Sequence, residues 1–142
     1  MKIFELSRKM LTLTGVFYPT GYAFILFPQL DHAEEAVREL EAAGFDEQKI
    51  MLLTPDIILR ELGKVVGSSD LKLPPVGTES ATVHKYVDLA QEGHHAVMVH
   101  APSDKDTERV SSAIRHLPFS YGQKYHLLAM EDLEHGAAPL AG

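Results

Sequence analysis

The sequence predicts an α+β sandwich built from two β-α-β units, because the same strand-helix-strand pattern occurs twice in the chain. The first copy spans residues 22–54 and the second spans residues 94–131. Residues of the two copies match at an offset of 73, as Asp31 and Asp104 do. Residues 63–80, between the copies, are rich in glycine, proline, serine and threonine, which is typical of a loop. We therefore expect a single domain with two related halves, since neither half has enough core to fold alone.

The first half is predicted to contain a buried strand, an amphipathic helix and a second strand. Residues 22–27 are apolar without interruption, which indicates a strand buried on both faces, and Pro28 ends it. Apolar residues recur at intervals of three and four over residues 32–43, and Gly44 follows where helices commonly end. This segment is therefore predicted as a helix. Residues 49–53 supply the second strand.

The remaining elements are placed by caps, prolines and periodicity. In chain order they are a helix at 55–62, a helix at 79–91, a strand at 94–100, a helix from Asp104 to Leu117 and a strand at 123–131. The single domain, residues 1–142, divides into an N-terminal arm at 1–20, a first half at 22–62, a joint at 63–78, a second half at 79–133 and a flexible tail at 134–142. The arm is left without an assigned structure, because its pattern fits a helix and a strand equally well.

Two β-α-β units with their helices on one face of the sheet form a ferredoxin-like sandwich, here extended by the two helices inserted between the repeats. The alternative is an open doubly wound sheet. We favour the sandwich because the strands are few and the repeat is internally symmetric. Its other face would carry Tyr22, Phe24 and Leu26, an apolar surface that the inserted helices, a second subunit or a ligand must cover. We therefore expect a homodimer.

Composition points to a cytoplasmic protein. The chain has no cysteine, so it has no disulfide framework and no thiolate nucleophile or metal ligand. The N-terminal segment alternates polar and apolar residues and lacks the apolar run of a signal peptide or a membrane span. With 13 basic and 20 acidic residues, the net charge of −7 disfavours non-specific binding to nucleic acid. No membrane partner is expected.

Four segments carry a resemblance to a known family: GYAFILF, HAEEAVRELEAAGF, KIMLLTPD and TVHKYVDLAQEGHHAVMV. They resemble the heat-induced general stress protein domain of bacteria, in which a helix with the pattern AEEAVxxLxxAGF follows the first strand. The resemblance covers residues 22–131. It implies a small, ferredoxin-like, stress-associated protein without established chemistry, and it supplies no catalytic residues.

Residues 20–27, TGYAFILF, also resemble the RNP1 octapeptide of RNA recognition motifs, and only the leading basic residue of that octapeptide is missing. Tyr22 and Phe24 would share one strand face and could stack on unpaired bases. However, an RNA recognition motif needs a further strand and helix upstream, and the preceding 20 residues are too few to supply them. RNA binding therefore stays an alternative, and nucleic acid is disfavoured as a partner.

Eight histidines raise the question of a metal site, but their spacing argues against one. His94 and His100 would lie about 20 Å apart on one strand, and His95 points to the opposite face. His84 and Asp88 are one helical turn apart and could chelate a metal, but such an exposed pair is more often a solvated helix face. We therefore predict neither a metal site nor a cofactor.

His100 and His126 are the better functional candidates, because they are expected on neighbouring strands, where their rings could meet and titrate near neutrality. The alternative for each is a core histidine with satisfied hydrogen bonds. Together with Tyr22 and Phe24, they form the predicted set of binding residues. No catalytic residue is predicted, because the chain has neither a G-x-S-x-G turn nor a glycine-rich phosphate loop.

These patterns favour a non-enzymatic, stress-associated or regulatory protein that acts through an unknown protein partner or small ligand. The two alternatives are an RNA-binding protein that uses strand 22–27 and a small-molecule enzyme with a histidine acid or base. A flat apolar patch would favour the first reading, basic residues around Tyr22 the second, and an enclosed polar pocket the third.

Overall fold

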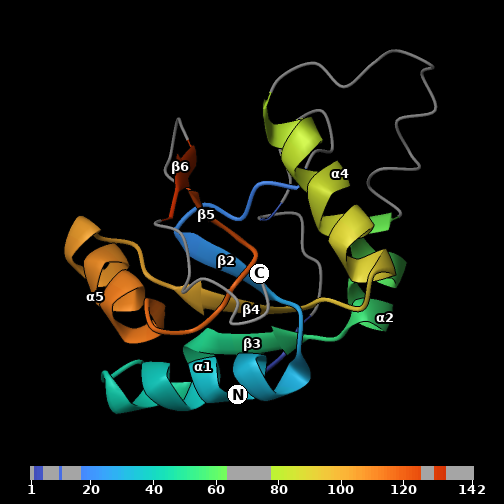
Figure 1. The fold of residues 1–142 in the computed structure, drawn as a ribbon. Coiled ribbons are helices and arrows are strands. Elements are labelled where there is room, and N and C mark those ends of the chain that lie inside the picture. Colours follow the sequence, from blue (N-terminus) through green and yellow to red (C-terminus); the bar gives the residue numbers. More distant parts are fainter. Residues whose placement is uncertain (1, 5–9, 11–16, 64–77, 126–129, 134–142) are drawn as a thin grey trace.

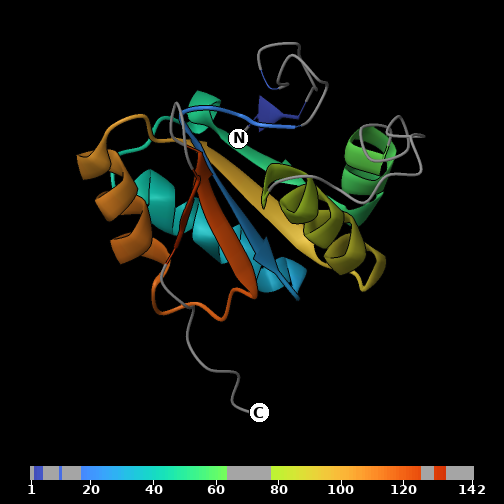
Figure 2. The same cartoon turned by 90° about the horizontal axis from the view of Figure 1, so that it is seen from above.

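The computed structural model describes residues 2–4, 10, 17–63, 78–125 and 130–133, which form one sheet with helices on both faces (Figure 1 and Figure 2). The strands are β1 (Lys2–Ile3), β2 (Tyr22–Phe27), β3 (Ile50–Leu53), β4 (His95–His100), β5 (Tyr121–Tyr125) and β6 (Met130–Asp132). The helical elements are α1 (Leu30–Ala42), η2 (Glu47–Lys49), α2 (Pro55–Ile57), η3 (Ile58–Leu62), α4 (Thr78–Gln91) and α5 (Asp104–Ile114). Across these ranges, no helix combines the length and apolar content that crossing a bilayer requires.

The sheet has six strands in the order β1-β3-β4-β2-β5-β6. Its four middle strands are antiparallel to one another, and β1 joins the edge in parallel with β3. β2 and β4 pair over their full length, from Tyr22 opposite His100 to Phe27 opposite His95. Each β-α-β unit skips one strand, because α1 connects β2 to β3 past β4 and α5 connects β4 to β5 past β2. The predicted α+β class is confirmed.

Helices α1 and α5 pack against one face of the sheet. The apolar stripe of α1 consists of Ala33, Ala36, Val37 and Leu40, all buried, and α5 buries Val110 and Ile114. These side chains meet residues of β2 and β4 that point to the same face, including Ile25 and Val97. The stripe repeats at the helical period, which explains why the sequence located both helices. At the start of α5, the Ser103 hydroxyl accepts a hydrogen bond from the Asp106 backbone N–H at 3.0 Å.

The opposite face of the sheet is covered by α4, η3 and part of the N-terminal arm (Figure 2). Phe24, Leu26 and Met98 lie beneath Tyr86 and Val83 of α4, and Phe17 of the arm completes this layer. The buried residues on this face are therefore contacted within the chain by the inserted helices. Of the three covers that the sequence analysis allows for this apolar surface, the structure shows the inserted helices, and a homodimer stays a prediction.

The centre of this second layer is aromatic. The rings of Phe24 and Tyr86 stack with centroids 4.1 Å apart, and neither residue is exposed. The phenol oxygens of Tyr86 and Tyr125 form a hydrogen bond of 2.6 Å. Burial, and secondly the neighbouring Tyr125, raise the pKa of Tyr86 well above its usual value of 10.0. Both rings therefore belong to the core rather than to a surface.

Several predicted boundaries were wrong. The strand expected at 123–131 is two strands, because the chain turns back and β6 pairs antiparallel with β5, Gln123 opposite Asp132. Residues 126–129 lie outside the described residues, as does the predicted tail at 134–142. The bounds of the helix expected at 55–62 are correct, although it changes from a turn of α-helix into a π-helix at Ile58. The arm supplies β1, and all but the two end residues of the joint at 63–78 lie outside the described residues.

Candidate functional site

The structure brings together two of the predicted binding residues, Tyr22 and His100. They are partners across β2 and β4, and their ring centroids are 5.0 Å apart with the planes tilted by 58°. Both side chains are half-buried. Burial lowers the pKa of His100 below its usual value of 6.5, and the positive charges of Lys49 and Lys124 lower it further, against a smaller opposing effect of Asp106. This pair lies at one end of the sheet.

The other two predicted binding residues do not join them at a surface. Phe24 is fully buried beneath Tyr86, so it offers no area to a base or another ligand in this conformation. His126 lies outside the described residues. The expectation that its strand neighbours the strand of His100 was wrong, because β2 lies between β4 and β5. The reason is the skipped strand in each β-α-β unit.

His94 has a structural role. It precedes β4, and its Nδ1 lies 3.0 Å from the Leu89 carbonyl while its Nε2 lies 2.9 Å from the Ser120 hydroxyl. Both ring nitrogens of His94 therefore have hydrogen-bond partners within the fold. His84 and Asp88 lie on α4, where His84 is half-buried and Asp88 is exposed. Among the described residues, this pair has no third ligand close enough to complete a metal site.

Stability should fall on acidification, because two half-buried histidines have lowered pKa values. Burial is the main cause for both His95 and His100, and the buried Nδ1 of His95 has no partner among the described atoms. An unfolded chain binds these protons more readily than the native chain, so the native state loses stability as the pH falls below the unfolded value of 6.5. Melting temperatures of wild type and His100→Gln from pH 8 to 5 measure this. We expect a smaller loss in the variant; identical profiles would contradict the assignment for His100.

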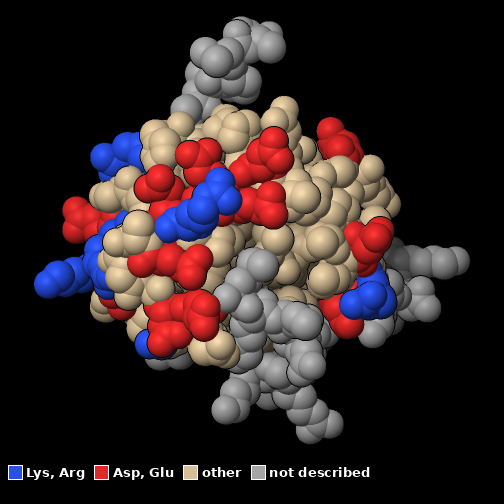
Figure 3. All heavy atoms as spheres, turned by 90° about the horizontal axis from the view of Figure 1, so that it is seen from below, with Lys and Arg blue, Asp and Glu red and all other residues tan. Residues whose placement is uncertain are grey.

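The face formed by α1 and α5 is predominantly acidic. Figure 3 looks onto the underside of the molecule as drawn in Figure 1, where α1 lies, and acidic side chains predominate there. The acidic residues of α1 are Asp31, Glu34, Glu35, Glu39 and Glu41, against the single basic residue Arg38. Glu34 and Glu41 are exposed, as is usual for the solvated side of an amphipathic helix, whereas Glu35 and Glu39 are half-buried.

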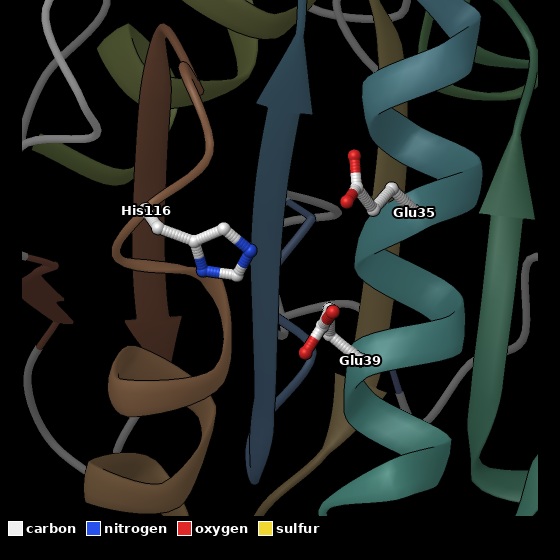
Figure 4. A group of neighbouring side chains, drawn as sticks. All are labelled: Glu35, Glu39 and His116. Carbon is white, nitrogen blue, oxygen red and sulfur yellow. The ribbon is translucent and has the colours of Figure 1, made fainter.

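Glu35, Glu39 and His116 form a cluster between the two helices (Figure 4). One ligand atom from each residue lies within 4.8 Å of the others, and both glutamates are half-buried while His116 is exposed. Figure 4 shows the carboxylates leaving α1 toward the turn after α5, from which the His116 ring points back toward them. We call these three residues the Glu-Glu-His cluster.

Among the residues that the structure describes, no cationic side chain pairs with the two carboxylates of the Glu-Glu-His cluster. Neither Glu35 nor Glu39 forms an ion pair with any residue that the structure describes. Two like charges four residues apart on a helix repel each other and destabilise it by about 0.2–0.5 kcal/mol. A bound cation would remove this repulsion. The cluster is therefore electrostatically suited to a positive ligand.

A shallow groove of about 570 Å³ runs between the helices beside this cluster. It is lined by Glu39, Ala42, Ala43, Lys105, Glu108, Arg109, Ser112 and Ala113. Arg109 is held in place, because it pairs with Asp106 at 3.0 Å, donates to the Ala43 carbonyl and lies over the Phe45 ring. Glu39 belongs both to the groove lining and to the Glu-Glu-His cluster, so the two features are adjacent.

The sequence contains only part of the signal for this site. Glu35 and Glu39 are four residues apart on a predicted helix, which places them on one face. His116 comes from the second repeat, just after α5, and no local pattern connects it with them. The repeat could have indicated that His116 lies near the two glutamates, since equivalent helices of two β-α-β units lie side by side on one sheet face.

No protein-family model, curated protein or solved structure was found to match the chain. The site is therefore interpreted from its own geometry and charge.

Proposed function

We propose that the chain is a non-enzymatic regulatory protein that binds a divalent transition-metal ion at Glu35, Glu39 and His116. The observation that supports this most is the convergence of two carboxylates and one imidazole from separate segments of the chain (Figure 4). The resemblance to heat-induced general stress proteins supports a stress-associated role, and the composition supports a cytoplasmic location. In this proposal the metal ion is the small ligand that the regulatory protein binds.

The donor set favours a particular class of ion. An imidazole nitrogen with two carboxylate oxygens suits Zn²⁺, Co²⁺ or Mn²⁺, whereas Ca²⁺ and Mg²⁺ prefer oxygen ligands alone. Metal-ligand bonds of about 2.1 Å place neighbouring donors roughly 3.3 Å apart. The donor atoms, now within 4.8 Å, would therefore have to approach by up to about 1.5 Å. Because the three side chains are half-buried or exposed, we expect rotation of their side chains to provide this approach.

We also propose that the four middle strands and their crossovers form a ferredoxin-like sandwich. The strand order β3-β4-β2-β5, with α1 and α5 on the same face, supports this arrangement. A homodimer through the face that carries Phe24 is not part of the proposal, because α4 and η3 already cover that face. The metal-binding surface lies on the other side of the sheet.

Calorimetric titration of the full chain with Zn²⁺ tests the metal site. We expect one ion per chain, and an affinity that falls roughly tenfold or more in each of Glu35→Gln, Glu39→Gln and His116→Gln. Glu41→Gln is the matched control, since it removes an equal charge from an exposed position of the same helix. An equal loss of Zn²⁺ affinity in Glu41→Gln would show that the ion is attracted by the overall negative charge of the helix and not by the cluster. Absence of saturable binding would contradict the proposed function.

A further inference from the structure

We infer that the bound metal takes a small dicarboxylate as a co-ligand, with one carboxylate on the ion and the other near Lys105. This inference rests on the proposed metal site and identifies the class of molecule that the same site would recognise. Three protein donors leave at least one coordination position open, since the proposed ions take four or more ligands. The cluster is accessible from solvent and adjoins the groove, because His116 is exposed and Glu39 lines the groove.

The groove leads from the metal site to a cationic side chain. Glu35 lies near His116, and Ala43 accepts a hydrogen bond from Arg109, so α1 and α5 run antiparallel along the groove. Lys105 lines its far end and forms no ion pair with any described residue. Arg109 lies beside it, but its charge is already balanced by Asp106. Lys105 is therefore the cation that remains for a ligand.

The length of the groove and its alanine side chains favour a ligand in which a flexible run of methylene carbons joins two anionic groups. At a rise of 1.5 Å per residue, Lys105 and His116 are separated by about 16 Å along the helix direction, a span that the lysine side chain shortens. Ala42, Ala43 and Ala113 line the groove beside Ser112, and the alanine methyl groups suit methylene carbons better than a polar linker. A dicarboxylate of six to eight carbons, such as adipate or suberate, combines these features.

Glu108 also lines the groove, on the same helix as Lys105, and its negative charge repels an anionic ligand. It forms no ion pair with any described residue, so its charge weakens the field of Lys105 one turn away. We therefore expect modest affinity that weakens further as salt is added. The two residues also provide a test with opposite signs, because neutralising Lys105 should weaken dicarboxylate binding and neutralising Glu108 should strengthen it.

The experiment titrates Zn²⁺-loaded full-length protein with suberate and with octanoate, the monocarboxylate of the same length, by calorimetry. We expect suberate to bind more tightly than octanoate. Lys105→Gln should weaken suberate binding about fivefold and Glu108→Gln should tighten it about twofold, as exposed charge pairs allow. Lys49→Gln, which removes an equal charge from an exposed site away from the groove, should change neither affinity.

The outcomes separate this inference from the proposed function. Zn²⁺ titration without any carboxylate is performed first on wild type and on both groove variants, and it should give the same stoichiometry in all three. Saturable metal binding with equal affinity for suberate and octanoate, or no effect of Lys105→Gln on suberate, would overturn the co-ligand inference and leave the metal site intact. No metal binding in the first titration would overturn the metal site and the co-ligand together.

Discussion

Replacing Phe24 with alanine is expected to lower the free energy of unfolding by about 3–5 kcal/mol. The ring is fully buried, stacks on Tyr86 at 4.1 Å and contacts Phe17 edge to face at 5.8 Å. Removing it leaves a cavity between β2 and α4 that the stacked ring on α4 cannot fill without breaking its hydrogen bond to Tyr125. Urea denaturation followed by circular dichroism measures the change.

Tyr86→Phe is the matched control for Phe24→Ala. It keeps the stacked ring and removes only the hydroxyl, so the expected loss is about 1 kcal/mol. The RNA-binding alternative makes the opposite prediction, since stacking on bases requires Phe24 at the surface. Unchanged stability of Phe24→Ala together with lost binding of an oligonucleotide would overturn the placement of this ring in the core.

Replacing Lys124 with alanine is expected to destabilise the chain by about 3 kcal/mol. Lys124 is fully buried between β5 and α5, and its ammonium donates a hydrogen bond of 3.0 Å to the Thr107 hydroxyl. That hydroxyl in turn donates to the Ser103 carbonyl at the start of α5. Alanine removes both the hydrogen bond and the packed methylenes, so the loss combines a polar and an apolar contribution.

Lys124→Met separates the two contributions. Methionine keeps a chain of similar length and avoids burying an ammonium group, so we expect it to cost less than alanine does. Both variants are compared with wild type by chemical denaturation. Equal stability of Lys124→Ala and wild type would show that the lysine is not packed as the structure places it.

Local sequence patterns predicted most of the helices and strands, because residues close in the sequence determine where these elements form. The stripe of α1, the unbroken apolar run of β2 and the glycine after α1 each depend on neighbours within a few residues. Gly44 has a φ of +100°, a conformation that favours glycine at a helix end. The strands that the sequence analysis did not predict depend on pairing with strands formed by other parts of the chain. β6 exists through its pairing with β5, and β1 through its pairing with β3.

The candidate site was largely beyond sequence reasoning for the same reason. Tyr22 and His100 were both selected, but their pairing follows from a register between β2 and β4 that no local pattern specifies. Glu35 and Glu39 fit a solvated helix side in any sequence-based analysis. His116 comes close to them only because α1 packs beside α5. That packing follows from the sheet order, in which each β-α-β crossover passes over one intervening strand.

Nuclear magnetic resonance with a paramagnetic ion tests the metal site most directly, because it reports where an ion binds. Substoichiometric Co²⁺ should selectively shift or broaden the signals of Glu35, Glu39 and His116, and excess Zn²⁺ should restore them. Signals of His84 on α4, across the sheet, should stay unchanged. His116→Gln should abolish the effect at both glutamates. Perturbation centred on His84 or His100, or spread evenly over the acidic surface, would contradict a metal site between α1 and α5.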